Sequence, residues 1–145
     1  MKRLLLITAL SFIAVTSCKK KGCIDINAKN YNSEAKKDDG SCSYEGSAVF
    51  WVHADAQISI YGSLIEVFVE GESIGTMNIN STNTSAPDCG TGGVNYYTDL
   101  NGEKNKIINY EIKYSAPGQN GETDFLYKSG STKINGGMCQ TVEIN

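Results

Sequence analysis

Short apolar runs with a two-residue period dominate the chain from residue 46 onward. In the run 107–114, polar residues take one face and the apolar face holds Ile108, Tyr110, Ile112 and Tyr114. Turn-forming pairs such as Asn101-Gly102 separate the runs at roughly 8–12 residue intervals. No segment there has a sustained helical period. The pattern therefore predicts an all-β fold, an antiparallel β-sandwich or small barrel of about eight short strands.

Strands are expected where these runs occur, at residues 47–54, 58–61, 63–70, 73–79, 94–100, 107–114, 124–128, 131–134 and 139–144. The first is apolar on both faces at Val49-Phe50-Trp51-Val52, which indicates a central strand. Gly71-Glu72 is expected to form a hairpin turn, and the polar, glycine-rich stretch 80–93 a long loop. Pro117-Gly118 and Asn120-Gly121 mark a further loop.

The first eighteen residues have the layout of an export signal. Lys2 and Arg3 precede an apolar stretch, residues 4–15, which would span roughly 18 Å as a helix, too short for a bilayer core of about 30 Å. This favours a removable signal peptide. Val15-Thr16-Ser17-Cys18 resembles the lipobox of bacterial lipoproteins. The resemblance implies removal of residues 1–17 and lipidation of Cys18, which would hold the protein to a membrane. An ordinary secretory signal with a chance cysteine is the alternative.

Residues 18–22 are expected to be the lipidated cysteine and a basic tether, Lys19-Lys20-Lys21, beside anionic headgroups. In the bacterial lipoproteins that this segment resembles, aspartate after the lipidated cysteine often retains the protein in the inner membrane. Lys19 stands at that position here. The resemblance therefore implies the outer membrane, with the periplasmic or external face left open.

Five cysteines are present, an odd number for an exported chain. If Cys18 carries lipid, four remain, and the pairs Cys23–Cys42 and Cys89–Cys139 are favoured because each brackets one coherent segment. Loops of about 20 and about 50 residues would then contribute roughly 3 and 4 kcal/mol in the chain-entropy description. A zinc site made by the four thiolates is the weaker alternative, since no C-x2-C pair occurs.

Residues 23–45 form a region dense in Asp, Asn, Gly and Ser, which favour turns over strands. The pattern from Gly22-Cys23-x-Asp25 through Asn30-Tyr31-Asn32 to Asp38-Asp39-Gly40-Ser41-Cys42 resembles a short module repeated in bacterial cell-surface and secreted proteins. The resemblance implies a small, disulfide-closed irregular module that serves as an extracytoplasmic spacer or cap. The sandwich would follow it at residues 46–145.

The module also offers hard oxygen ligands, at Asp25, Asn27, Asp38 and Asp39. Oxygens of this kind suit Ca²⁺, so a calcium site is one hypothesis. The spacing is not that of an EF-hand. The alternative, in which these side chains cap turns and accept hydrogen bonds from backbone N–H groups, is therefore favoured, and no other cofactor is expected.

Residues 65–76 resemble the hairpin of PEGA-type and transthyretin-like envelope domains, with an apolar strand, a Glu-Gly turn and then Ile74-Gly75-Thr76. The resemblance implies an Ig-like or transthyretin-like sandwich that binds a partner or acts as a spacer. It brings no catalytic residue with it.

Composition and motifs argue against several activities. The formal net charge of −3 gives no reason to expect nucleic acid as a partner. His53 is the single histidine, and no G-x-S-x-G elbow accompanies it, so a structural role is favoured over catalysis. Gly90-Thr91-Gly92-Gly93 precedes a strand rather than a helix, which argues against a phosphate loop. We therefore expect that the protein is not an enzyme.

The tyrosines leave a carbohydrate-binding role open. Tyr96 and Tyr97 must point to opposite faces of their strand, while Tyr110 and Tyr114 fall on an apolar face and are expected in the core. The leading hypothesis is an outer-membrane-anchored lipoprotein that acts as a non-enzymatic binding or structural module of the cell envelope. Its partner would be an envelope protein or a glycan. The alternative is a small carbohydrate-binding or glycan-processing accessory protein of the envelope.

Overall fold

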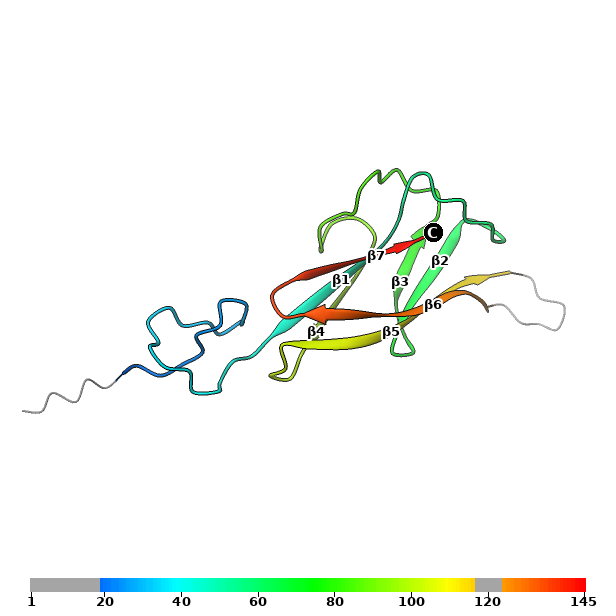
Figure 1. Ribbon diagram of the computed structural model, residues 1–145. Coiled ribbons are helices and arrows are strands. Elements are labelled where there is room, and N and C mark those ends of the chain that lie inside the picture. Colours follow the sequence, from blue (N-terminus) through cyan, green and yellow to red (C-terminus); the bar gives the residue numbers. More distant parts are fainter. Residues whose placement is uncertain (1–18, 117–123) are drawn as a thin grey trace, which may run out of the picture.

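The computed structural model describes residues 19–116 and 124–145 (Figure 1). Within these ranges the chain has seven strands and no helix, which confirms the all-β prediction. The strands are β1 (Glu45–Val52), β2 (Leu64–Val69), β3 (Glu72–Asn78), β4 (Val94–Asp99), β5 (Asn105–Ser115), β6 (Asp124–Asn135) and β7 (Cys139–Ile144). The expected signal peptide 1–17, Cys18, and the loop marked by Pro117-Gly118 and Asn120-Gly121 lie outside the described residues.

The strands form two sheets that enclose one core, so the sandwich prediction is also confirmed. The smaller sheet has the order β4-β1-β7 and the larger one β3-β2-β5-β6. The irregular N-terminal region lies at one end of the sandwich, and β5 and β6 extend toward the other end (Figure 1). The molecule is therefore elongated, with the N-terminal region at one end and the paired ends of β5 and β6 at Ser115 and Asp124 at the other.

Alternate residues of both sheets face the shared core, as the two-residue period predicts. The inner faces of β1 and β2 are almost fully buried and consist of Ala48, Phe50, Val52, Ile65, Val67 and Val69. Phe50 of the smaller sheet meets Tyr110 of the larger sheet edge to face, with ring centroids 5.3 Å apart. Tyr110 and Tyr114 both pack against the core, in agreement with their expected place.

Strand β1 is the central strand of the smaller sheet and is buried on both faces. Val49 and Trp51 point away from the shared core, yet both are buried. The loop 80–93 reaches this outer face at its end, where a Cβ on Gly93 would lie 3.0 Å from the Val49 side chain. The disulfide Cys89–Cys139 fastens this loop to β7. The predicted long loop is thus held against the smaller sheet.

Two expectations about individual strands are wrong. Residues 58–61 form no strand, although Ile58 and Ile60 do pack against the core. Alternation reports which side chains are buried, whereas a strand also needs a partner for its backbone, and this segment connects the two sheets. Residues 124–128 and 131–134 belong to the single strand β6, because Gly130 stays in register opposite Tyr110 instead of breaking the ladder.

The pairing of β1 with β7 is parallel, from Ser47 opposite Cys139 to Val52 opposite Ile144, where an antiparallel sandwich is expected. The other strand pairs are antiparallel. Parallel neighbours cannot be joined by a short hairpin, and here nearly the whole sandwich lies between them in sequence. A local pattern of alternation carries no information about such a pairing.

The turn between β2 and β3 lies one residue earlier than predicted, at Glu70-Gly71. Both residues have positive φ, 51° and 86°, as in the two-residue turns whose twist matches that of the strands they join. The predicted turn at Asn101-Gly102 is confirmed, with φ values of 52° and 84°.

Candidate functional site

The Cys-closed module, residues 23–45, shares its interior with the sandwich. Cys23, Ala28 and Tyr44 of the module belong to the same cluster of buried residues as Leu100, at the end of β4. The Leu100 N–H also donates to the Tyr44 carbonyl oxygen at 2.9 Å. A region this small buries little apolar surface alone. The module is therefore an extension of the sandwich core and not a separate folded unit.

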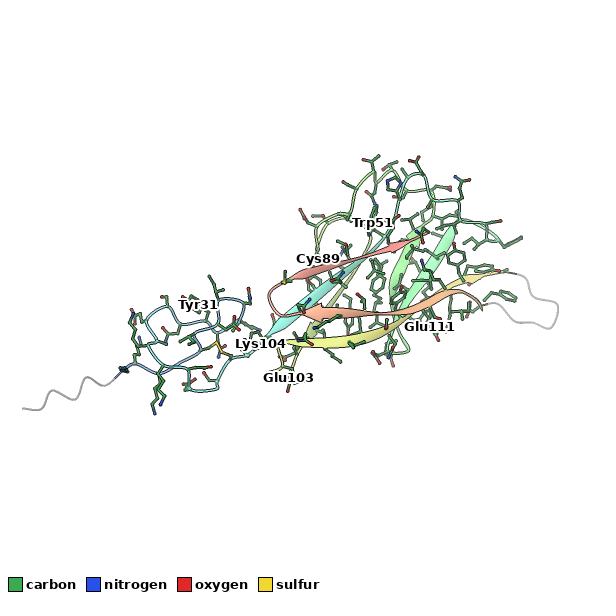
Figure 2. All side chains as sticks on the ribbon, viewed as in Figure 1. Tyr31, Trp51, Cys89, Glu103, Lys104 and Glu111 are labelled. Carbon is green, nitrogen blue, oxygen red and sulfur yellow. A yellow bond between two sulfur atoms is a disulfide. The ribbon has the colours of Figure 1, made fainter. Side chains whose placement is uncertain are left out.

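An ionic contact joins the module to the sandwich at the place where Figure 2 shows Lys104. Lys104 Nζ lies 2.6 Å from Asp25 Oδ2, and the Tyr44 hydroxyl donates to the same oxygen at 2.9 Å. The Asn27 N–H donates to Asp25 Oδ1 at 3.0 Å. These donors, with Lys104 the largest contributor, lower the pKa of Asp25 to about 2. Asp25 is thus held ionised as the centre of the joint.

The other shifted groups lie in the module or at the same joint. The hydrogen bond to Asp25 raises the pKa of Lys104, and burial followed by the Asp25 contact raises the pKa of Tyr44. Lys29 pairs with Glu45 at the start of β1, which raises the pKa of Lys29. Shifted pKa values often mark catalytic groups, but each of these has a structural partner. These shifted groups therefore mark contacts that hold the module against the sandwich.

Asx turns organise the interior of the module, as its composition predicts. Four side-chain oxygens each accept the N–H two residues ahead, those of Asp25, Asn32, Asp38 and Asp39. Asn30 bridges the two halves, because its amide donates to the Ser41 carbonyl at 2.6 Å and accepts from the Ser43 N–H at 2.9 Å. The predicted Cys23–Cys42 disulfide closes the module.

The four residues of the calcium hypothesis are divided among different surroundings. Asp25 and Asp38 border one pocket of about 430 Å³, which Lys104 also lines. Asn27 borders a different pocket, and the Asp39 carboxylate accepts the Ser41 N–H. Within residues 19–116 and 124–145, no group of three or more His, Cys, Asp or Glu side chains is placed to hold a metal ion. The calcium site stays a prediction, and the favoured alternative describes the hydrogen bonds that are seen.

His53 follows β1 directly and bonds to backbone groups of two nearby segments. Its Nδ1 accepts the Asp55 N–H at 3.0 Å, which leaves the proton on Nε2 to donate to the Thr84 carbonyl, 3.2 Å away. Thr84 belongs to the loop 80–93. His53 therefore helps to hold that loop, and the contacts that it makes are those of a structural residue.

Exposed tyrosines are spread over the molecule. Tyr96 packs against the core and Tyr97 is 62% exposed, which confirms that they take opposite faces. Tyr31 lies on the module and is 44% exposed, while Tyr61, in the connection between β1 and β2, is 64% exposed. No flat surface of several tyrosines is found among these described positions.

A pocket of about 330 Å³ lies at the end of the larger sheet that is remote from the module. We call it the distal pocket; its lining includes Tyr61, Leu64, Glu66, Lys113, Tyr114, Ser115 and Asp124. Tyr61 and Leu64 give it an exposed apolar side. Its carboxylates already have hydroxyl partners, Ser73 for Glu66 and Ser115 for Asp124. An open pocket with one apolar wall and a polar rim is suited to holding a ligand.

Several residues of the joint and of the distal pocket could not be predicted as site residues from the sequence. Asp25 stands out in the module pattern, but Lys104, its partner, is 79 positions away in an ordinary polar turn. Lys113 and Asp124 look like the solvent-facing residues of alternating strands. No local signal distinguishes them, because only strand pairing brings them together.

Comparison of the chain with protein-family models, curated proteins and solved structures finds no match. Among the described residues, no helix has the length and apolar character required to cross a bilayer.

Proposed function

We propose that this chain is a lipid-anchored, non-enzymatic protein of the outer membrane, whose module holds a β-sandwich at the membrane as a binding or structural unit. The proposal takes the anchor from the lipobox-like sequence at Val15–Cys18 and the class of the module and sandwich from the resemblances described above. The observation that carries it most directly is the joint, in which Asp25 binds Lys104 and Tyr44. Such a joint suits a module that is rigidly connected to the sandwich better than it suits a flexible linker.

The arrangement of the two ends also supports this proposal. Lys20 and Lys21, near the start of the described chain, bond to Lys36 and Lys37 of the module, and the distal pocket lies at the other end of the molecule. A chain held by lipid at Cys18 would therefore present the distal pocket away from the membrane. An envelope protein or a glycan would be its partner.

Metabolic labelling with an alkyne fatty acid, followed by separation of inner and outer membranes, tests the anchor. The wild-type chain should carry the label and sediment with the outer membrane, and Cys18→Ser should lose the label. The matched control is Cys23→Ser with Cys42→Ser, which should keep the label because those cysteines form the disulfide. Label retained by Cys18→Ser, or wild-type protein in the inner membrane, would contradict the proposal.

A carbohydrate-binding accessory role is the second candidate, and the observation that favours it is the exposed Tyr61 beside the polar rim of the distal pocket. Aromatic rings pack against sugar C–H faces. The carboxylates would accept hydrogen bonds from sugar hydroxyl groups, and the Lys113 ammonium group would donate to them. Calorimetric titration with peptidoglycan fragments and neutral oligosaccharides tests this role. Binding should be lost in Tyr61→Ala and kept in Tyr97→Ala, whose tyrosine has nearly the same exposure but lies on β4 of the smaller sheet, outside the distal pocket.

A further inference from the structure

Two lysine-rich segments, which are 16 residues apart in the sequence, lie side by side where the chain enters the module. Lys21 and Lys37 form an isolated parallel bridge, and the Gly22 N–H donates to the Lys37 carbonyl oxygen at 3.1 Å. The Lys36 N–H donates to the Lys20 carbonyl oxygen at 2.8 Å. We call the resulting set of exposed lysines the basic cluster: Lys19, Lys20, Lys21, Lys36 and Lys37.

Few acidic groups offset the charge of this cluster. Glu34 pairs with Lys20, and Asp39 lies near enough to Lys21 to feel its charge. Asp38 borders the pocket at the joint, together with Asp25. The five lysines of the basic cluster thus outnumber these three acidic residues, so the cluster keeps a net positive charge.

The sandwich carries the opposite charge. Residues 46–145 contain five lysines and eleven Asp or Glu, a net charge of −6 with His53 neutral. Residues 19–45 contain six lysines and five Asp or Glu, a net charge of +1. Positive charge is thus concentrated at the end of the molecule that enters the module, and negative charge on the remainder. An anionic surface would attract the first and repel the second.

We propose that the basic cluster rests on the phosphate headgroups of an anionic membrane and holds the sandwich upright above it. This inference rests on the proposed lipid anchor, because Cys18 immediately precedes Lys19. The anchor alone would fix the distance to the membrane and leave the orientation free. Lysines near an anionic surface bind it through charge, within about 10 Å at ordinary ionic strength. The rigid joint at Asp25 and Lys104 would pass that orientation on to the sandwich.

The test uses the full lipidated chain inserted into preformed vesicles of phosphatidylcholine, with or without phosphatidylglycerol. An amine-acylating reagent that does not cross the bilayer is added, and each lysine is read by mass spectrometry. Lys36 and Lys37 should react about fivefold more slowly on the anionic vesicles, and 1 M salt should remove this protection. The exposed sandwich residues Lys106 and Lys133 should react equally on both vesicles. Equal reaction of Lys36 and Lys37 on both would overturn the proposal.

Matched variants separate a charge effect from proximity to the membrane. Lys36→Gln with Lys37→Gln should weaken the protection of Lys19, Lys20 and Lys21, whereas Lys106→Gln with Lys133→Gln should leave it unchanged. Failure of the chain to float with neutral vesicles would contradict the lipid anchor itself. The proposal for the basic cluster can still be tested in that case. It predicts that the chain floats with anionic vesicles and that 1 M salt reverses this flotation. Absence of that flotation would refute it.

Discussion

Lys104 Nζ lies 2.6 Å from Asp25 Oδ2, and this contact crosses the boundary between the module and the sandwich. Tyr44 reaches the same carboxylate oxygen from a buried position. The module has one disulfide and few buried side chains of its own. The orientation of the module therefore depends on its contacts with the sandwich. Substitution of Asp25, which contacts Lys104, tests this dependence.

The stability of the joint should depend on pH in the acid range. Asp25 has a pKa lowered from 3.8 to about 2, so the stability that it contributes is complete above about pH 4 and is lost as the pH falls toward 2. Asp25→Asn should lower the melting temperature at pH 7, and this difference from wild type should shrink as the pH falls from 5 to 2. Differential scanning calorimetry at several pH values measures it.

Asp55→Asn is the control for that experiment, because the Asp55 side chain is 93% exposed and lies 3.8 Å from the His53 ring. It should leave the wild-type profile almost unchanged. A constant difference between wild type and Asp25→Asn over the whole pH range would show that the contact with Lys104 is not electrostatic.

Gly130 should not tolerate a side chain. It lies opposite Tyr110 in the β5–β6 register, and a Cβ at position 130 would be 2.6 Å from the Tyr110 hydroxyl oxygen. The ring covers the glycine and also packs on Phe50. Gly130→Val should therefore destabilise the sandwich by roughly 1–3 kcal/mol in urea denaturation. Ser129→Val, at an exposed neighbouring position, should have a much smaller effect.

A double-mutant cycle checks the cause of that loss. Tyr110→Ala removes the ring, so adding Gly130→Val to it should cost much less than in the wild-type chain. Additive effects of the two substitutions would mean that contact with the ring is not responsible.

The two disulfides should stabilise different parts of the molecule, and Trp51 can report the difference because it is the only tryptophan. Replacing Cys89 and Cys139 with serine frees the loop 80–93 from β7. We expect a loss of about 4 kcal/mol and a red shift of Trp51 fluorescence, since Trp51 is buried on the outer face of β1, which that loop approaches at Val49. Replacing Cys23 and Cys42 should cost about 3 kcal/mol and leave Trp51 fluorescence unshifted. A red shift in the second variant alone would contradict this assignment.

Calcium should have little effect on the melting temperature of the module. The Asp25 carboxylate already holds Lys104 and Tyr44, and those of Asp38 and Asp39 accept backbone N–H groups. Thermal melts in chelator and in millimolar calcium should therefore coincide. A higher melting temperature in calcium that disappears in Asp38→Asn would support the calcium hypothesis instead.

Periodicity, turns and cysteine spacing by themselves determined the all-β class, the burial of β1 on both faces, the loop 80–93 and both disulfide pairs, because each depends on residues near one another or on simple pairing. The parallel pairing of β1 with β7, the continuity of β6 through Gly130, the Asp25–Lys104 contact and the basic cluster were decided only by the tertiary structure. Their partners are distant in sequence, and an exposed lysine or a glycine in a strand has the same local pattern whichever partner the fold brings to it.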